Sequence, residues 1–309
     1  MIGSLPRLAD DLDDAIEKAV QLQLRYGVDL ISDGEQRADM LGYFEQIPGF
    51  TRTRAGLAVA GKVRPMRDAA DSYKVVDFMR AVEALRRMGV DSEVKISITG
   101  PVTLGFTAAS GGVKHYKSII DEDLYYDVVE ALSPIACELL RRGAYVQIDE
   151  PGLAGGFMSP QRSEKALSRL VDELEASQGL QRLSIHVCGN VAKTPGLSEV
   201  LQRLRIPTLS LAFSGLDEAN NLRLPLEKML SQNGKTLGLG CVSTKAQRPS
   251  EVDSVDTIRG RVQDMERRLG PGKIRYVHPD CGLGKTHIEV AKLILGNMKE
   301  ATESWDCPP

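Results

Sequence analysis

The feature of this sequence that most constrains its fold is a repeated alternation of short apolar runs with longer amphipathic stretches. A short stub at Ile2–Gly3 and seven runs rich in β-branched or aliphatic residues predict eight strands. The seven longer runs are Val28–Ser32, Val94–Thr99, Ala144–Asp149, Leu183–Val187, Thr208–Phe213, Thr236–Val242 and Ile274–His278. Eight strands that alternate with helices are typical of the (β/α)8 TIM barrel, an α/β fold with a parallel sheet.

The stretches between these runs have helical periodicity. Apolar residues recur every four positions over Leu12–Leu24, and similar patterns predict helices from about Glu122 to the residue before Gly143 and over Ile288–Lys299. No linker rich in Pro, Gly and Ser divides the chain. We therefore expect residues 1–309 to form a single domain.

The segment 36–92 is too long for a plain connection between a strand and the next helix. It contains two short runs, Phe50–Arg54 and Leu57–Ala60, that predict a hairpin, and a helical pattern over Ser72–Arg87. Long connections of this kind build the active sites of barrels. The segment is therefore predicted to be an insertion that caps the barrel mouth.

Composition and charge argue against several classes of function. The net charge is -3, and no cluster of Lys and Arg is interleaved with aromatic residues, which argues against a nucleic-acid partner. No apolar leader and no run of eighteen apolar residues is present, so a membrane-free, cytoplasmic protein is expected. Five cysteines, an odd number in a long chain, indicate free or metal-bound thiols in a reducing compartment.

Polar motifs stand at the ends of the predicted strands, where barrel enzymes carry their working residues. In chain order they are Gly3-Ser4, Asp33-Gly34-Glu35, Thr99-Gly100-Pro101-Val102-Thr103, Gln147-Ile148-Asp149-Glu150-Pro151, His186-Val187-Cys188 and Pro279-Asp280-Cys281-Gly282. An imidazole and two thiols carried to one rim predict a zinc site made by His186, Cys188 and Cys281. Zinc–thiolate sites activate other thiols, so the chemistry is expected to be on sulfur.

Taken together, these motifs resemble the catalytic barrel of the cobalamin-independent methionine synthase family. The resemblance also includes Asp39-Met40 and Tyr43-Phe44 after the Asp33-Gly34-Glu35 motif, and the motifs follow the family's order over nearly the whole chain. It implies a zinc-dependent methyltransferase that moves a methyl group to the thiol of homocysteine to give methionine. The thiol, ionised by zinc, would attack the methyl group directly.

The resemblance also implies roles for individual residues. It makes His186, Cys188 and Cys281 the zinc ligands. It places Ser4, Glu35 and Asp149 at the amino-acid end of homocysteine. These roles make physical sense, because a zwitterionic substrate needs carboxylates for its ammonium group and a hydroxyl donor for its carboxylate.

The methyl donor is a separate question. The family's second, N-terminal barrel, which helps to hold polyglutamylated methyltetrahydrofolate, is absent from this chain, so the resemblance is to the short core type. A methylated corrinoid such as methylcobalamin is then the expected donor, and a corrinoid protein could deliver it. In folate-using relatives an Asp and a His relay protons where this chain has Gly240–Lys245 with neither. A corrinoid leaving group needs no proton, which favours the same donor.

One further position departs from the family's pattern. The family's fourth zinc ligand is a Glu in a context like Leu-Ser-Leu-Glu-Phe, whereas this chain has Ala212 at that place. Asp217 or Glu218 could replace it, water could fill the position, or the site could keep three protein ligands.

Simpler interpretations of the same residues are also open. Asp33, Glu35, Asp149 and Glu150 could be rim charges paired with Arg37 or Lys95, and Gly3-Ser4 could be a turn. Cys137 and Cys307 fit a buried apolar residue and an exposed thiol better than metal ligands, whereas a ligand role for Cys241 is open. A structural role is expected for His115 and His278, and a helix-cap role for His287.

Three other functions are open at this stage. Methyltetrahydrofolate could be the donor. The chain could be a methyltransferase similar to the uroporphyrinogen decarboxylase-like family, which also uses zinc with His and Cys to activate other thiols such as coenzyme M. It could also be a metal-poor paralogue that binds a small molecule without catalysis. Glu35 and the Asp149-Glu150-Pro151 motif favour an amino-acid thiol.

Overall fold

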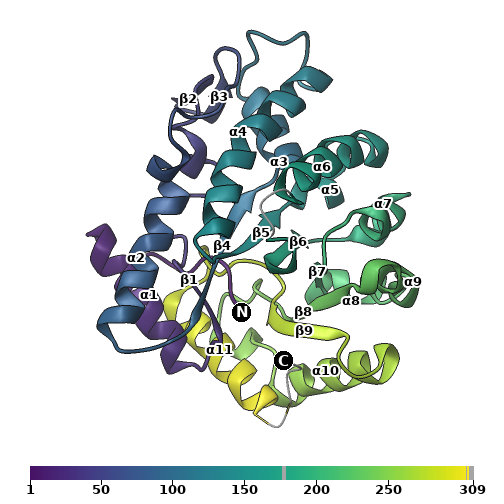
Figure 1. Ribbon diagram of the computed structural model, residues 1–309. Helices are drawn as coiled ribbons and strands as arrows, with labels where there is room; N and C mark the ends of the chain where they lie inside the picture. Colours follow the sequence, from purple (N-terminus) through teal and green to yellow (C-terminus); the bar gives the residue numbers. More distant parts are fainter. Residues whose placement is uncertain (176–178, 304, 306–309) are drawn as a thin grey trace.

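The computed structural model describes residues 1–175, 179–303 and 305, and it contains a seven-stranded parallel sheet surrounded by helices (Figure 1). The strands of this sheet, in spatial order, are β1 (Leu30–Ser32), β4 (Glu93–Thr99), β5 (Tyr145–Asp149), β6 (Leu183–Val187), β7 (Thr208–Ala212), β8 (Thr236–Val242) and β9 (Ile274–Pro279). Each predicted run of the sheet overlaps one of these strands, and none of their ends differs from the prediction by more than two residues. The α/β barrel predicted from the sequence is confirmed.

Helices lie between successive strands along the chain. The helices are α1 (Leu12–Arg25), α2 (Tyr73–Arg87), α3 (Pro101–Ser110), α4 (Glu122–Arg141), α5 (Pro151–Ala154), α6 (Pro160–Glu175), α7 (Leu197–Arg203), α8 (Glu218–Asn221), α9 (Leu226–Ser231), α10 (Val255–Leu269) and α11 (Ile288–Thr302). Several begin at a side chain that accepts a hydrogen bond from the first turn, such as Asp11 before α1 and Ser254 before α10. These caps satisfy backbone N–H groups that otherwise lack partners.

The eighth strand predicted at Ile2–Gly3 is not assigned as a strand within the described residues. The segment nevertheless runs between the two outer strands of the sheet. The backbone nitrogen of Met1 donates to Val277 O of β9 (3.1 Å), and Ser32 of β1 donates through its hydroxyl to Gly3 O (3.3 Å). No ladder of paired backbone groups with β1 or β9 is assigned to this segment within the described residues. The prediction of eight strands was wrong in this respect, although the segment occupies the expected place.

The insertion contains the predicted hairpin and helix. Strands β2 (Phe50–Thr53) and β3 (Gly56–Val59) pair antiparallel, with Phe50 opposite Val59. The hairpin is tied to the loop after α3, because Val59 N donates to Gly112 O (2.8 Å). The hairpin and the helix α2 are confirmed. That the whole insertion caps the barrel mouth, and that residues 1–309 form one domain, stay predictions.

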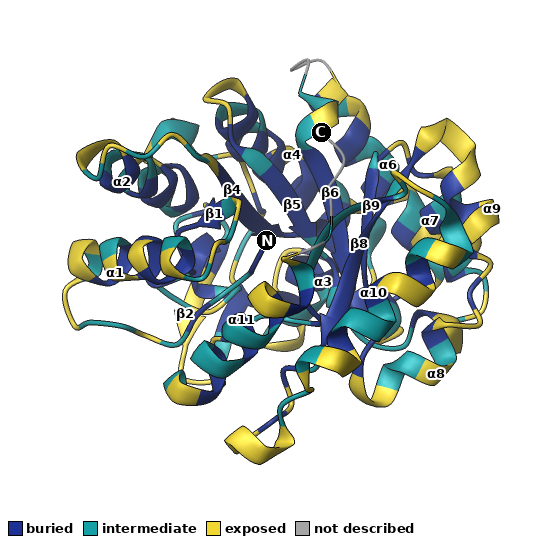
Figure 2. Ribbon diagram, turned by 90° about the horizontal axis from the view of Figure 1, so that it is seen from below, coloured by how far each residue is buried: buried dark blue, intermediate teal, exposed yellow. Residues whose placement is uncertain are grey.

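The strands separate apolar and polar side chains onto two faces. Alternate residues of the central strands, such as Ile96, Ile148 and Leu209, belong to the buried apolar core that the helices cover. The residues between them include Lys95, Gln147 and other polar residues that are also buried. Figure 2 shows the buried strands at the centre and the exposed faces of the helices outside. The barrel interior therefore carries polar groups, whereas apolar packing joins the sheet to its helices.

The start of α3 depends on Glu150, which follows β5. The Glu150 carboxylate accepts hydrogen bonds from Val102 N (2.9 Å), Thr103 N (2.9 Å) and Thr103 Oγ1 (2.6 Å). Burial raises the pKa of Glu150 to about 7 although these bonds act to lower it. Glu150 therefore has a structural role as the partner of a helix N-terminus.

A methyl group at Gly100 should disturb this arrangement. A Cβ added there would lie 2.2 Å from Glu150 Oε1, so we expect Gly100→Ala to lower the free energy of unfolding by about 2 kcal/mol. Urea denaturation measures the change. Gly260→Ala is the matched control, because a Cβ in that part of α10 meets nothing within 4 Å. The control should be neutral or stabilising by up to about 1 kcal/mol; equal stability of both variants would contradict the proposed clash.

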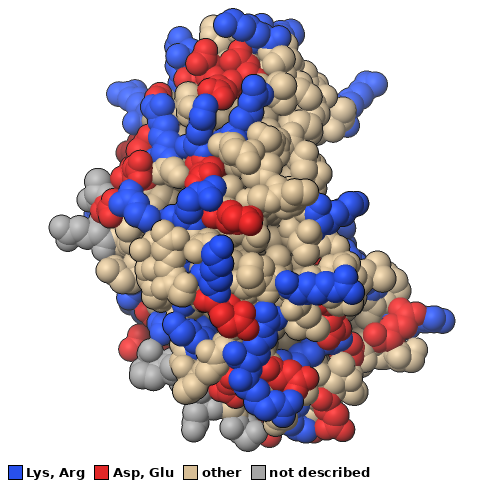
Figure 3. Space-filling view, turned by 90° about the vertical axis from the view of Figure 1, so that its right-hand side faces the viewer, with Lys and Arg blue, Asp and Glu red and all other residues tan. Residues whose placement is uncertain are grey.

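The described part of the protein has no membrane-spanning helix, and the face shown in Figure 3 has no extended surface region of a single charge sign. Within residues 1–175, 179–303 and 305, none of the helices combines the length and the apolar character needed to span a bilayer. On the face shown in Figure 3, Lys and Arg side chains are interspersed with Asp and Glu. That face therefore carries no extended region of one charge sign that would steer a charged ligand.

Candidate active site

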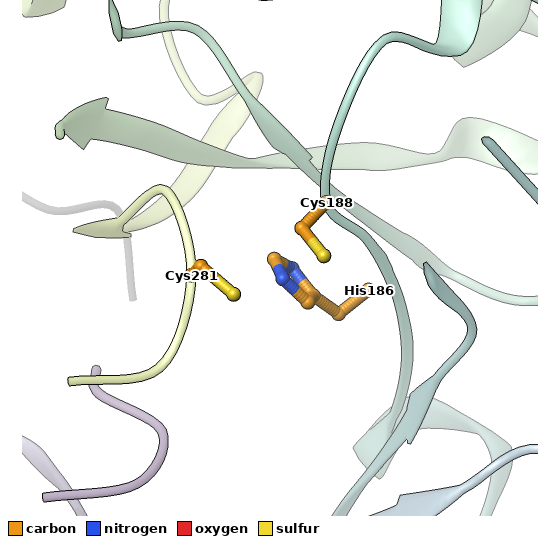
Figure 4. A group of neighbouring side chains, drawn as sticks. All are labelled: His186, Cys188 and Cys281. Atoms are coloured by element: carbon orange, nitrogen blue, oxygen red, sulfur yellow. The ribbon is translucent and has the colours of Figure 1, made fainter. Parts of the chain in front are cut away.

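The two thiols and the imidazole predicted as metal ligands lie together. His186 is on β6, Cys188 is two residues further along the chain, and Cys281 follows the end of β9. One ligand atom from each of the three lies within 4.8 Å of the other two. Figure 4 shows both sulfur atoms directed toward the space beside the His186 ring. Parallel strands bring these residues to the same rim although 93 positions separate Cys188 from Cys281 in the sequence (281 − 188).

The two thiols differ in their acidity. A hydrogen bond with Cys188 lowers the pKa of Cys281, against the effect of burial, and a further bond with His186 lowers it too. The same bond with Cys281 raises the pKa of Cys188, and burial adds to this. Of the two thiols, Cys281 therefore loses its proton more readily than Cys188. Two sulfur atoms and an imidazole nitrogen are a donor set that suits Zn²⁺, and the residues present fit that ion.

A short hydrogen-bonded chain lies behind His186. Its Nδ1 is 2.9 Å from the Ser210 hydroxyl, which is 2.9 Å from His278 Nε2. His278 Nδ1 lies 2.6 Å from the carbonyl oxygen of Pro279. His278 was expected to have a structural role, and Ser210 carried no signal in the sequence. The chain occupies Nδ1 of His186 and leaves its Nε2 for a ligand.

Asp280 fixes the turn that presents Cys281. Its carboxylate accepts from Ser214 Oγ (3.1 Å), Thr244 N (2.9 Å) and Thr244 Oγ1 (2.9 Å). These contacts connect the loops that follow β7, β8 and β9. Asp280 is buried, and its three donors explain why a carboxylate stands next to the cysteine.

Among the described residues, no protein side chain completes the group as a fourth metal ligand. Ala212 is only 2% exposed at the end of β7 and offers no donor atom. Glu218 pairs with Arg261 through both carboxylate oxygens at 2.8 Å. Asp217 is not part of the group of ligand atoms found among the described residues. Of the alternatives open from the sequence, replacement by Asp217 or Glu218 finds no support.

Glu35 has an unusual backbone and a buried partner. Its φ is 50°, and Asn233 is the only other non-glycine residue with a positive φ in the described part of the chain. Its carboxylate is 2.8 Å from Lys74 Nζ of α2, and Lys74 is itself only 1% exposed. Burial acts to lower the pKa of Lys74, but the Glu35 and Asp33 carboxylates outweigh it and raise the pKa. Lys74 is therefore a cation that holds one oxygen of Glu35.

The simpler interpretation of the rim charges is only partly correct. Arg37 pairs with Asp77 at 2.6 Å, and Lys95 donates to the Ser97 hydroxyl at 2.9 Å. Neither forms an ion pair with Glu35 in the structure, because Lys74 takes that place. Lys74 was missed because it lies 39 residues from Glu35 in a segment without a motif.

Asp149 stands beside the metal-ligand group. It lies opposite His186 in the pairing of β5 with β6 and accepts a hydrogen bond from Gln147 Nε2 (2.7 Å). Burial raises the pKa of Asp149, while His186 and Lys95 act to lower it and Glu35 acts to raise it. The Asp149 charge also raises the pKa of Cys188. These mutual effects place the two predicted substrate carboxylates and the metal ligands in one electrostatic site.

Ser4 lies at the same rim. Its hydroxyl oxygen accepts from Gly284 N (3.2 Å), and its carbonyl oxygen accepts from Leu283 N (2.7 Å). A Cβ on Gly282 would lie 2.3 Å from Ser4 Oγ, so glycine is needed there for the close approach. The hydroxyl proton of Ser4 is not used in these bonds and can be donated to a substrate.

Cys137, Cys241 and His287 lie apart from this group. Cys241 is fully buried, with its Sγ 3.8 Å from His278 O, and Cys137 is 4.0 Å from Glu173 O in the helix layer. Cys307 lies outside the described residues. His287 caps α11 as predicted, since its ring accepts from Glu289 N (3.4 Å).

Removal of the buried cation beside Glu35 should destabilise the protein. Lys74→Met leaves Glu35 and Asp33 without their positive partner, and we expect a loss of about 2 kcal/mol in the free energy of unfolding. Lys18→Met is the matched control, because Lys18 pairs with Asp14 on the surface with both side chains about half exposed. The control should change stability by less than about 0.5 kcal/mol. Urea denaturation of both variants checks this, and similar values for the two would contradict the assigned role of Lys74.

Comparison with known proteins gives a consistent picture. A family model described as "Cobalamin-independent synthase, Catalytic domain" matches residues 4–304. A methionine synthase from Methanothermobacter marburgensis is 32% identical over 295 residues, which cover 94% of this chain and 89% of that relative. A 5-methyltetrahydropteroyltriglutamate–homocysteine methyltransferase from Thermosynechococcus vestitus is 28% identical, and the match covers 95% of this chain and 38% of that relative.

A solved structure agrees with the observed architecture. The B12-independent methionine synthase from Shewanella sp. W3-18-1, in complex with selenomethionine, superposes with a TM-score of 0.68. The superposition covers 98% of this chain and 96% of that one at 20% sequence identity. This likeness bears on the fold alone.

Proposed function

Since the chain belongs to the cobalamin-independent methionine synthase family, whose catalytic-domain model matches residues 4–304, we propose that it methylates homocysteine from a 5-methyltetrahydropteroyl donor with the help of Zn²⁺. The chain is a methyltransferase. The observation that best supports the proposal is the convergence of His186, Cys188 and Cys281 within 4.8 Å, beside Asp149. The alternatives of a uroporphyrinogen decarboxylase-like enzyme and of a non-catalytic paralogue are not carried further, because the matching family is a different one and is enzymatic.

The methyl donor expected from the sequence was wrong. Methylcobalamin or a methylated corrinoid, and with it a corrinoid protein as partner, conflicts with membership of a family that is described as cobalamin-independent. The relative from T. vestitus, named for a methyltetrahydropteroyl substrate, matches 95% of this chain. The missing Asp and His in Gly240–Lys245 had suggested a leaving group that needs no proton. That inference assumed that the proton must come from this one loop, whereas other groups at the mouth can supply it.

The three metal-ligand residues would hold Zn²⁺, whose chemistry when bound is to ionise a thiol at neutral pH. His186 would contribute Nε2, because its Nδ1 is bonded to Ser210. Cys188 and Cys281 would contribute their sulfur atoms as thiolates, so metal binding would release thiol protons. Asp280 keeps the Cys281 loop in place through Ser214 and Thr244.

The amino-acid end of homocysteine would lie against the rim carboxylates. Asp149 has no cation within ion-pair distance among the described residues, so its charge is available for the substrate ammonium. Glu35 offers the carboxylate oxygen that Lys74 does not hold, and the Ser4 hydroxyl can donate to the substrate carboxylate. Charge-assisted hydrogen bonds of this kind are about twice as strong as neutral ones and fix orientation as well as affinity.

The transfer itself breaks the bond between the donor nitrogen and the methyl carbon and forms a carbon–sulfur bond. The thiol proton is given up before attack, and the departing amine takes up a proton. Fixing the substrate at its ammonium and carboxylate groups removes much of the entropic barrier to this step. The side chains of the site act by binding and orientation, and none of them needs to form a covalent bond with the methyl group.

An assay of the intact chain with two donors tests the proposal. We expect methionine to form from homocysteine and a 5-methyltetrahydropteroyl glutamate, and not from methylcobalamin. A chelator should remove the activity and added Zn²⁺ should restore it. Activity with methylcobalamin alone would contradict the proposed donor, and activity that survives the chelator would contradict the proposed metal.

A further inference from the structure

The hydrogen bonds behind His186 cross the barrel interior from β6 to β9. His186 lies opposite Ser210 in the pairing of β6 with β7, and the Ser210 hydroxyl reaches past β8 to His278. Strand β8 permits this contact because it carries glycine at positions 238 and 240, which pair with Ser210 and with His278. A Cβ on Gly238 would lie 2.3 Å from a ring carbon of Tyr276, so no larger residue fits there without rearrangement.

The donor and the acceptor in each of these hydrogen bonds can be assigned by starting from His278. The Pro279 carbonyl oxygen can only accept, so His278 Nδ1 must carry a proton and donate to it. His278 is 3% exposed and lies between the rings of His186 and Tyr276, where a charged imidazole would be poorly solvated. A neutral ring with a proton on Nδ1 has a lone pair on Nε2. The Ser210 hydroxyl therefore donates to His278 and has only acceptor capacity left for His186.

The hydrogen bond between Ser210 and His186 determines the tautomer of His186. Because the Ser210 oxygen accepts, the proton between the two groups belongs to His186 Nδ1. A neutral His186 with a proton on Nδ1 presents the lone pair of Nε2 to the side of the cysteines. The opposite direction of the chain would place the proton on Nε2, and that nitrogen could not bind a metal.

We propose that Ser210 and His278 are positioning residues that hold His186 in the tautomer with a free Nε2, and that they thereby raise the affinity of the site for Zn²⁺. The proposal rests on the function proposed for His186 as a ligand. The outer partner of a metal-binding histidine usually accounts for about 10- to 100-fold in metal affinity. Neither residue touches the two cysteines through a hydrogen bond that the structure records, so their effect must pass through His186.

Zinc affinity of the full chain, measured by competition with a chromophoric chelator, tests the proposal. Ser210→Ala removes the acceptor, and His278→Leu frees the hydroxyl to donate toward His186; both should weaken binding about 10- to 100-fold. Ser210→Thr keeps the hydroxyl and should bind like the parent chain. Thr208→Ala is the matched control. Thr208 lies two residues before Ser210 on β7, and its hydroxyl is hydrogen-bonded to that of Thr236 (3.0 Å) and not to either histidine.

The outcomes separate this proposal from the function on which it rests. Suppose that the parent chain binds Zn²⁺ and Cys281→Ser does not, but that Ser210→Ala and His278→Leu bind as tightly as the parent. The proposed role of Ser210 and His278 is then wrong, while the proposed metal site is supported. If the parent chain itself does not bind Zn²⁺, the proposed function fails. Should a variant not fold, nitrogen NMR of the parent's His186 ring decides: a proton on Nδ1 is expected, and a proton on Nε2 overturns the proposal.

Discussion

Replacing Cys281 by serine is expected to abolish both zinc binding and methyl transfer. A hydroxyl is a far weaker donor to Zn²⁺ than a thiolate, and Cys281 is the more acidic of the two thiols in the site. Thiol activation by a bound metal would lower the barrier by several kcal/mol, so kcat/KM for homocysteine should fall by at least about 1000-fold.

Metal analysis and the methyl-transfer assay should be carried out on the same preparation. Cys137→Ser is the matched control, because this thiol lies between α4 and α6, where its nearest recorded partner is the carbonyl oxygen of Glu173. The control should keep its zinc and its activity. A Cys281→Ser protein that retains activity in the presence of a chelator would remove the metal from the mechanism.

The second large effect is expected from Asp149→Asn. The amide keeps the shape of the side chain and removes its charge, so the substrate ammonium would lose its partner at a half-buried position. Loss of one member of a buried charged pair costs about 3 kcal/mol, and kcat/KM for homocysteine should fall by about 100-fold.

The effect should depend on the substrate in a specific way. An analogue of homocysteine without the amino group should react slowly with the parent chain, and Asp149→Asn should change that slow rate little. Comparison of both substrates with both proteins isolates the interaction of the ammonium with the carboxylate. If the substitution slowed the two substrates equally, Asp149 would be acting on the metal site or on the fold, and its assignment to the ammonium would be wrong.

Much of the fold could be predicted because most of the strands are short runs in which an aliphatic residue stands at every second position. Leu183–Val187 and Thr236–Val242 have the bounds that the sequence indicated. The segment Ile2–Gly3 was assigned wrongly because a strand requires continued backbone pairing, and that depends on where neighbouring strands end. Nothing in a two-residue run contains that information.

Some residues of the candidate site could also be predicted from the sequence, and others could not. The convergence of His186, Cys188 and Cys281 could be predicted because all three stand at the ends of parallel strands, and their residue types indicate metal binding. Lys74, Ser210 and the role of His278 could not, because each acts through a contact with a residue distant in the sequence. Lys74 meets Glu35 across 39 positions, and Ser210 meets His278 across 68. A lone serine in an apolar strand resembles many others that have no role.

The methyl donor shows a different kind of error. The expectation of a corrinoid depended on two expected absences, that of a second barrel and that of an Asp and a His in Gly240–Lys245. A missing acid in one loop says little when several loops meet at one mouth. The presence of a donor set at the rim was a stronger basis for prediction than the absence of a proton relay from Gly240–Lys245.

The polar lining of the barrel has a consequence for how this protein can change over time. The hydrophobic contacts that drive folding lie between the sheet and its helices, whereas residues such as Gln147 and Ser184 face the lumen. Substitutions in the outer layer are constrained by close packing. Lumen residues take little part in these apolar contacts. Changes to the lining that keep its buried polar groups hydrogen-bonded can therefore adapt the site to a new thiol while the outer layer is retained.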